Sequence, residues 1–531
     1  MSKNNTLAAI LALIVLLIVS GCADTSDLEE ALLVAQREAA ALATQNADLQ
    51  NSSAKDAAAA ATESANESNA SSTRAAGALA EAQGAAEEAI AAAEATSEAI
   101  GAAATAAAFP DIDYDTNLYG VIDELDLNGI VVTWWHNNSG RQFDAVQTII
   151  DEFNNTNPYG IVVDGTNEGD LGVVFEKMQV GLNTGDVPSL VSATPGQIAD
   201  YQARTGIVGL DPYFEHPTFG LSVAEQADFH RGVIDSTRFP QFENQLLGFP
   251  QDRAMELLYY NADLLAELGF VEPPRNIREF EEMACEAAAF SAETTGFQIV
   301  PNGASVMSYA IASGDEVYDP VRNAMDVSQA GLISYLEAIE RMFDEECVVV
   351  SQELFSDQTA FGQGNTLFIQ GSSLNLPFIQ AAVEDNVPED GEPFNWSIAP
   401  IPYIGFEPIQ NTYGVNFAIP KTTAEEQLSA WIFIQYFASI EQQAQWVRTT
   451  NNYPLRLSTS TLLESYFQEN PIYQEGFVLL KYSANEPAVR NYDSIQEEVT
   501  RSYASMFVLD DEIPTIFSNL NGQINSLLTR Q

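Results

Sequence analysis

The sequence predicts an α/β fold, in which strands and helices alternate from about residue 130 to the end of the 531-residue chain. The clearest unit begins with an apolar run at 130–135 and continues through a short polar loop. Four apolar residues from Phe143 to Phe153 then follow at spacings of 3, 4 and 3, and a second apolar run lies at 161–163. The spacing is that of an amphipathic helix, and a strand–loop–helix–strand unit builds a parallel sheet. Because the chain is too long for one core, we expect two or more domains.

The first residues have the features of an exported lipoprotein. Lys3 precedes an apolar run at 7–19, which has the length of a signal-peptide core and is too short to span a membrane comfortably. The run ends in Val19-Ser20-Gly21-Cys22, which resembles the bacterial lipobox. We therefore expect a signal peptide at 1–21 and a lipid on Cys22 that anchors the protein to the outer face of the cytoplasmic membrane. The alternative is an ordinary secretory signal with a chance cysteine.

Residues 22–108 form an alanine-rich segment without aromatic side chains, which cannot build a packed core. Within it, residues 28–49 show the alternating spacings of 4 and 3 of a short coiled-coil seam, with Asn46 at a seam position. Two hypotheses stay open: a helical spacer between membrane and folded part, and a stalk that oligomerises. Alanine seams bury little area, which favours the spacer.

The globular part is expected to span residues 109–531, and its later segments continue the alternation. Strands are predicted at 189–191, 257–261, 366–373 and 413–420. Helices are predicted at 197–201, 263–268, 277–289, 333–343, 425–438 and 441–449.

The charge balance excludes some classes of partner. The chain has 21 basic and 75 acidic residues and a net charge of −54, so it repels nucleic acid and anionic membrane surfaces. A saline habitat and a simply acidic secreted protein are both compatible with this composition.

No catalytic motif is present in the globular part, where GxSxG, HExxH and GxxxxGK[ST] patterns are all missing from the sequence. The three histidines are scattered and no CxxC pair occurs, so we expect no enzyme activity, cofactor or metal site. Cys285 and Cys347 are candidates for a disulfide, because an exported protein meets an oxidising environment.

Six motifs occur in an order typical of one known family. They are WWHNNSG at 134–140, FNNTNP at 153–158, GDVPSL at 185–190, LLYYN at 257–261, YGVNFAIP at 413–420 and NNYPLR at 451–456. With these motifs, residues 127–531 resemble the extracellular solute-binding proteins of ABC importers, in the sugar-binding group that includes maltose and glycerol-3-phosphate binders.

The resemblance implies a two-lobed, type II periplasmic-binding-protein clamshell with the ligand captured in the cleft between the lobes. It implies delivery to ABC permease subunits in the membrane, and no catalysis. The lobes are expected at about 126–246 with 375–425, and at about 247–374 with 426–531.

The first site candidates follow the first strand. Ligands of parallel sheets bind beyond the carboxyl ends of the strands, and aromatic faces beside amides and hydroxyls suit a sugar. We expect Trp135, His136, Asn137 and Ser139 to bind ligand; for Ser139 the alternative is a helix N-cap. Because neighbouring side chains alternate along a strand, Trp134 is expected in the core.

Other candidates come from the resemblance and from loop positions. Asp252 and Arg253 precede a strand where the chain enters the second lobe, and could bind sugar hydroxyls or form an inter-lobe salt bridge. Ser372 and Ser373 follow a strand, and could line the cleft or act as caps. The remaining candidates are Tyr413, Gly414, Asn452, Tyr453 and Arg490.

Three functions follow. The first is a lipid-anchored binder of a sugar or oligosaccharide that serves an ABC transporter. The second is a binder of a glycerophosphodiester or another anionic solute, which predicts that Arg141, Arg253 and Arg490 cluster in the cleft. The third is a surface scaffold whose stalk oligomerises through residues 28–49.

Overall fold

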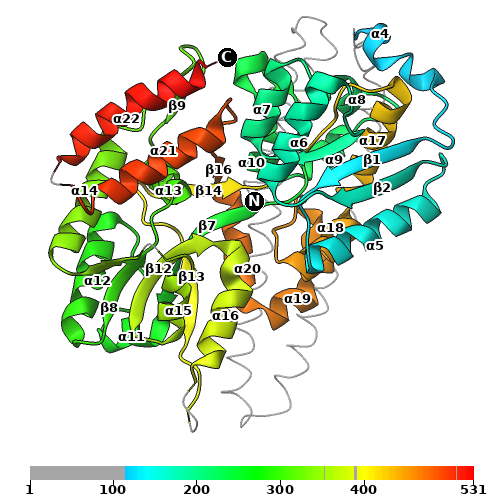
Figure 1. Cartoon of the computed structure of the whole chain (residues 1–531). Helices are drawn as coiled ribbons and strands as arrows, with labels where there is room; N and C mark the ends of the chain where they lie inside the picture. The colour runs from blue at the N-terminus through cyan, green and yellow to red at the C-terminus, as the bar shows by residue number, and fades with distance from the viewer. Residues whose placement is uncertain (1–113, 352, 388–390, 510, 531) are drawn as a thin grey trace, which may run out of the picture. The chain divides into compact units, whose positions relative to one another are not determined.

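The computed structural model describes residues 114–531, apart from 352, 388–390, 510 and 531. The expected signal peptide, the lipidated Cys22 and the alanine-rich segment 22–108 lie outside the described residues. Within the described part, no helix is both long and apolar enough to span a membrane. Strands and helices alternate throughout, which confirms the predicted α/β class (Figure 1).

The first lobe is built on a five-stranded sheet. Its order is β2 (Val162–Asn167), β1 (Val131–His136), β3 (Leu190–Ala193), β15 (Asn416–Ala418) and β6 (Phe249–Pro250). β1 is parallel to β2 and β3, as the strand–loop–helix–strand unit predicted, and β15 is antiparallel to β3 and β6.

Helices cover both faces of this sheet. One core combines α5 (Arg141–Thr156) and α17 (Ala424–Phe437) with the β1 face that carries Trp134, whose ring lies 5.7 Å from that of Phe433. The opposite face, which carries Trp135, packs against α6 (Leu171–Thr184) and α7 (Pro195–Ala203). The two tryptophans therefore alternate as predicted, but both are used in packing.

The second lobe is built on a seven-stranded mixed sheet. Six strands follow the order β11 (Val348–Val350), β8 (Thr295–Ile299), β12 (Thr366–Ser372), β7 (Ala254–Asn261), β14 (Gln410–Tyr413) and β16 (Ser483–Asn485), and β13 (Trp396–Ala399) also pairs with β7. One face packs against α12 (Ile277–Phe290), α13 (Gly303–Ala312), α14 (Ala330–Asp344), α21 (Tyr492–Ser505) and α22 (Ile513–Leu528). The other packs against α15 (Ser356–Gly362), α16 (Leu376–Asp385) and α20 (Pro471–Leu479).

The sheet pairing corrects the expected boundaries of the lobes. Residues 375–413 belong to the second lobe, because β13 and β14 pair antiparallel with β7. α17, which was assigned to the second lobe from residue 426 onward, buries Trp431 and Phe433 in the core of the first. The chain returns to the first lobe at β15 and leaves it again after α18 (Ile440–Thr450).

Three segments therefore cross between the lobes, and they lie side by side. The first segment is 251–253 and the second is 414–415. They are joined by a hydrogen bond of 2.9 Å from the Gln251 amide to the Val415 carbonyl. In the third, the Tyr453 amide donates to the Arg253 carbonyl at 2.8 Å. These bonds join the two sheets at one narrow hinge.

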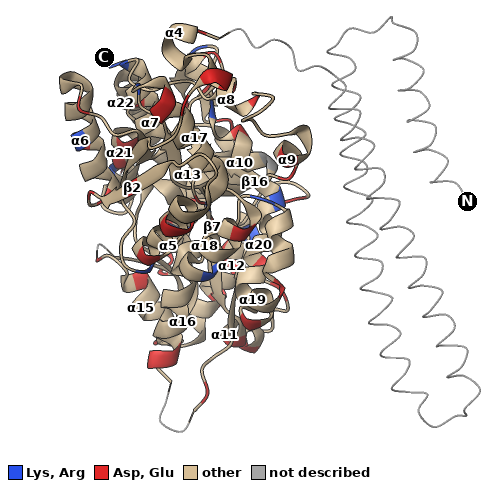
Figure 2. Ribbon diagram, turned by 90° about the vertical axis from the view of Figure 1, so that its right-hand side faces the viewer, with Lys and Arg blue, Asp and Glu red and all other residues tan. Residues whose placement is uncertain are grey.

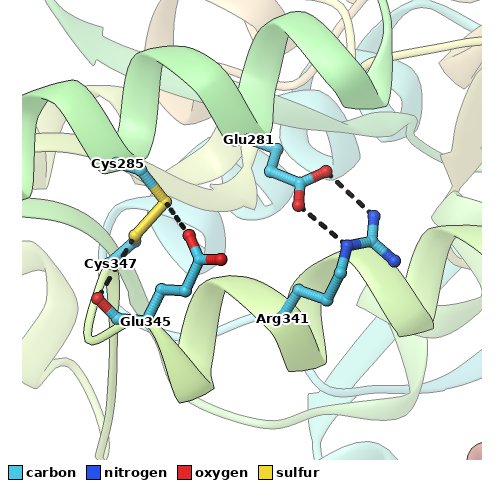
Figure 3. Close-up of a disulfide and its surroundings, with 5 residues drawn as sticks. All are labelled: Glu281, Cys285, Arg341, Glu345 and Cys347. Carbon is cyan, nitrogen blue, oxygen red and sulfur yellow. Dashed lines mark hydrogen bonds and ion pairs between the residues drawn. A yellow bond between two sulfur atoms is a disulfide. The ribbon is translucent and has the colours of Figure 1, made fainter.

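A disulfide links Cys285 on α12 to Cys347, which directly precedes β11, and confirms the predicted pairing (Figure 3). Beside it, the Arg341 guanidinium of α14 donates two hydrogen bonds of 2.9 Å to the Glu281 carboxylate of α12. The disulfide uses the sulfur atoms of both cysteines, so neither can bind a metal as a thiolate while the disulfide is intact.

Candidate ligand-binding site

A cavity of about 370 Å³ lies between the two lobes, beside the three crossing segments. Its wall comes from the loop after β1, the start of α7, the crossing segments, and the segment from β16 to α21. Sites for small organic ligands have volumes of about 300–1,000 Å³ and are often found between domains. The cavity therefore has the size and the position of a small-molecule site.

The first lobe contributes amides to the wall. Asn137, Asn138 and Gln142 lie where β1 gives way to α5. Asn138 is only 2% exposed, and its Oδ1 accepts from Gln251 Nε2 at 3.3 Å. Its Nδ2 has no hydrogen-bond partner among the residues that the structure describes. A buried donor without a partner is costly, so this amide is a candidate to bind a ligand oxygen.

Asp252 and Arg253 form the hinge side of the wall. Asp252 Oδ1 accepts from the Val415 amide at 2.8 Å, and burial raises the pKa of its carboxyl to about 6. Arg253 is 1% exposed and binds the protein itself. Its Nη1 donates to the Asp252 carbonyl at 2.7 Å and to Asn416 Oδ1 at 3.0 Å, and its Nη2 donates to Ser236 Oγ at 2.5 Å.

Tyr413 and Gly414 complete this side. The Tyr413 hydroxyl donates to Glu256 Oε2 at 2.9 Å, just behind the wall. Burial raises the pKa of Glu256 to about 7. A Cβ at Gly414 would lie 2.3 Å from the Asp252 carbonyl oxygen, so only glycine allows the two crossing segments to approach.

The second lobe contributes an acidic segment between β16 and α21. Glu486 accepts from Asn411 Nδ2 at 2.8 Å and from Gln496 Nε2 at 2.9 Å, and burial raises the pKa of its carboxyl. Asp493 Oδ2 accepts from Gln197 Nε2 of α7 at 3.0 Å. That bond joins the two lobes across the cavity wall.

The family model described as "Bacterial extracellular solute-binding protein" matches residues 148–475 of this chain, more than half of its length. The chain belongs to this family. The solute-binding protein is also 20% identical, over 298 residues, to a protein of Brucella abortus (strain 2308) that is named as a binding protein. That match spans 54% of this chain and 69% of the relative.

Solved structures of other binding proteins share the fold. The sugar-binding protein MalE from Xanthomonas citri aligns with a TM-score of 0.65 at 19% identity, over 75% of this chain and 97% of that one. UgpB from Mycobacterium tuberculosis, solved with glycerophosphocholine, aligns with a TM-score of 0.62 at 19% identity, over 75% and 98%. The GacH receptor of Streptomyces glaucescens, solved unliganded and with acarbose, has a TM-score of 0.60 at 17% identity, over 75% and 98%.

The structure of this solute-binding protein brings six of the predicted site residues into the cavity wall. They are Asn137, Asp252, Arg253, Tyr413, Gly414 and Asn452. All except Asn137 belong to the ends of the crossing segments or lie directly on them. That they contact a ligand stays a prediction.

Two candidates on β1 are placed elsewhere. The Trp135 ring packs toward α6 and carries Lys177 Nζ 4.0 Å above its centroid. His136 is fully buried between the rings of Trp134 and Phe143, and burial lowers the pKa of its imidazole to about 4. The strand continues through His136, so its side chains still alternate between the two helix layers.

Three serine candidates also lie outside the cavity wall. Ser139 is exposed, and the N-cap of α5 is Gly140. Ser372 Oγ accepts from the Leu374 amide at 3.3 Å, as the capping alternative expects, whereas Ser373 Oγ accepts from the Met255 amide of β7 at 3.1 Å and caps no helix.

The last two candidates, Tyr453 and Arg490, lie near the hinge and the cavity but do not line the cavity. Tyr453 is fully buried, with its ring 5.0 Å from that of Tyr473. Arg490 Nε lies 3.6 Å from Asp200 Oδ1 on α7, and so forms an inter-lobe ion pair.

Sequence reasoning missed the most acidic part of the wall. Glu486, Tyr492, Asp493 and Gln496 carry no motif, and in a chain with 75 acidic residues no single carboxylate is conspicuous. Acidic residues are spread over many parts of the ribbon, and basic residues are sparse (Figure 2). These wall residues are distinguished only by their position beside the cavity, which the folded structure reveals.

Proposed function

We propose that this protein is the lipid-anchored, extracellular solute-binding component of an ABC transporter, which captures a sugar or oligosaccharide between its lobes and delivers it to the permease. The observation that carries the proposal is the cavity between two α/β lobes at a three-segment hinge. Membership of the solute-binding family and the likeness in fold to sugar-binding proteins such as MalE support it.

The mechanism is a hinged closure. Ligand binds one lobe of the open form, and contacts with the other lobe form only on closing, so ligand shifts the equilibrium toward the closed form. In the structure the lobes are joined by hydrogen bonds from Gln197 to Asp493 and from the Asn491 amide to Asp200. We infer that ligand and these contacts together hold the form that docks on the permease.

Aromatic stacking is not the main source of affinity in this proposal. All five tryptophans fall in the described part and none of them lines the cavity, where Tyr413 and Tyr492 are the aromatic residues. Amide, hydroxyl and carboxyl groups lie in the wall beside apolar surface, a combination that suits the hydroxyls and C–H faces of a sugar. The modest volume favours a short sugar over a long oligosaccharide.

The arrangement of the arginines does not favour the anionic alternative. Both Nη atoms of Arg253 donate to protein acceptors, Arg490 pairs with Asp200, and Arg141 is exposed at the start of α5. The three therefore form no cluster that could bind a phosphate in the cavity. The scaffold alternative concerns residues 28–49, which lie outside the described part.

Thermal-shift measurements on the full chain test the proposal, with neutral mono- and disaccharides, glycerophosphodiesters and amino acids as probes. A ligand that binds only the folded state raises the melting temperature. We expect a shift with at least one sugar. A shift with glycerophosphodiesters alone would favour the anionic alternative, and no shift with any sugar would contradict the proposal.

The anchor is tested separately. We expect the wild-type protein to fractionate with bacterial membranes and its Cys22→Ala variant to be released or to stay unprocessed, because the acylated thiol is then missing. Mass spectrometry of the mature N-terminus identifies the modified cysteine. An unmodified Cys22 in membrane-bound protein would rule out this anchor.

A further inference from the structure

The cavity wall has an excess of negative charge. Asp252, Glu486 and Asp493 lie in it, against the one basic side chain found there among the described residues, that of Arg253. Arg253 is no free counter-charge for a ligand, because both of its Nη atoms donate to protein oxygens. Behind the wall, the buried carboxyl of Glu256 adds a further acidic group.

A second observation points to a ligand independently of these charges. Asn138 is 2% exposed and lines the same cavity, yet its Nδ2 has no partner among the described residues. Arg253 Nε, also in the wall, is a second buried donor without a partner there. Buried donors are normally satisfied, so both predict a ligand that brings oxygen acceptors.

We infer that the cavity takes an amine-bearing sugar of one or two rings, with its protonated amine against Glu486 and Asp493 and its oxygens against Asn138. This inference rests on the proposed function and narrows its substrate class. A cavity of about 370 Å³ is at the lower end of the usual range, which limits the number of rings.

The charge argument decides between classes of sugar. Asp252 is buried, Glu486 is half-buried and Asp493 is exposed, and desolvation raises the pKa of all three carboxyls, so covering them with a ligand that brings no cation is costly. A protonated amine reduces the excess of negative charge in the cavity and forms charge-assisted hydrogen bonds. A sugar phosphate or uronic acid adds a like charge, and a neutral sugar leaves the excess uncompensated.

The test is calorimetric titration of the full chain with pairs of amino sugars and their N-acetylated counterparts. The pairs cover the gluco, galacto and manno series and a glucosamine disaccharide, with glucose and maltose as neutral references. We expect one amine to bind about tenfold tighter, or more, than its N-acetylated partner. Equal or tighter binding of the neutral forms overturns the inference and leaves the proposed function standing. If no sugar binds, both are overturned.

Isosteric variants locate the amine. Glu486→Gln and Asp493→Asn should each weaken binding of the amine about tenfold more than binding of the N-acetylated sugar. Glu469→Gln removes the same charge from an exposed position outside the wall and should change neither affinity. An undiminished preference in both cavity variants overturns the inference. The wild-type comparison does not depend on how the variants fold.

Discussion

At the scale of single residues, the hinge depends on Arg253. Its guanidinium donates hydrogen bonds to the Asp252 carbonyl of the first crossing segment, to Asn416 next to the second, and to Ser236 of the first lobe. The sequence suggested that it binds a sugar or forms a salt bridge, and the structure assigns most of its donors to hydrogen bonds within the protein. The residue lines the cavity and supports it at the same time.

Arg253→Met should lower the free energy of unfolding by about 3–5 kcal/mol, because it removes a buried charge network and leaves its acceptors unsatisfied. Urea denaturation of the full chain measures the change. Arg322→Met is the matched control: it breaks an exposed ion pair with Asp319 and should cost less than about 1 kcal/mol. Equal effects would show that the hinge network contributes nothing beyond a surface pair.

Glu256 makes stability depend on pH. Burial raises the pKa of its carboxyl from 4.5 to about 7, so the folded state holds a proton that the unfolded state has already lost in this window. The stabilisation is fully present below pH 4.5 and is lost as the pH rises to about 7. Asp252, with a pKa raised to about 6, acts in the same direction.

We expect the free energy of unfolding of wild type to fall by about 1–3 kcal/mol relative to that of Glu256→Gln between pH 5 and 7, while buried His136, whose pKa is lowered to about 4, acts in the opposite direction in both proteins. Chemical denaturation at a series of pH values checks this. Glu281→Gln, which removes a carboxylate that pairs with Arg341 outside the cavity, is the comparison. An identical pH slope in wild type and Glu256→Gln would exclude Glu256 as the cause.

Most of the predicted site residues on or beside the crossing segments line the cavity, Tyr453 excepted, whereas those on β1 do not, and contact with a ligand stays a prediction for all of them. The motifs around Asp252, Tyr413 and Asn452 mark places where the chain changes lobes, and a cleft between lobes must be lined there. His136 failed because a sequence does not show where a strand ends, and one more extended residue turned the side chain into the core.

At the scale of elements, the helices and strands followed their apolar periods, whereas their distribution between lobes did not follow their order in the chain. β13 and β14 come late in the sequence, yet they pair with β7 in the second sheet. Pairing between distant strands depends on tertiary packing, which local periodicity does not encode.

The disulfide between α12 and the start of β11 closes a separation of 62 residues. We expect the double variant Cys285→Ala/Cys347→Ala to lose about 2–4 kcal/mol of stability, because the unfolded chain gains freedom. Thermal and urea unfolding measure it, and reduction of the wild-type protein should give a similar loss. Ligand affinity should not change, since neither cysteine lines the cavity.

At the scale of the whole molecule, the lobes meet through α7 and the segment before α21. Asp200 of α7 accepts a hydrogen bond from the Asn491 amide and forms an ion pair with Arg490, both on that segment. These bonds can form only when the lobes are together. They are therefore part of the difference in free energy between open and closed forms.

Asp200→Ala should weaken ligand binding about three- to tenfold while changing the stability of the unliganded protein by less than about 1 kcal/mol. Calorimetry gives the affinity, and small-angle scattering should show a more open unliganded form. An unchanged affinity would mean that these contacts form equally well without closure.

We propose that a small solute binds in the cavity between the lobes. Calorimetric titration of the full chain with the sugar panel, compared between wild type and Ala304→Phe, tests it most directly. Ala304 lines the cavity at the start of α13, so a larger side chain there fills the space without changing its charge. We predict that the sugar bound by wild type is lost from the variant, whose unliganded melting temperature stays similar. Equal binding by both proteins would contradict the account, because the solute would then bind elsewhere.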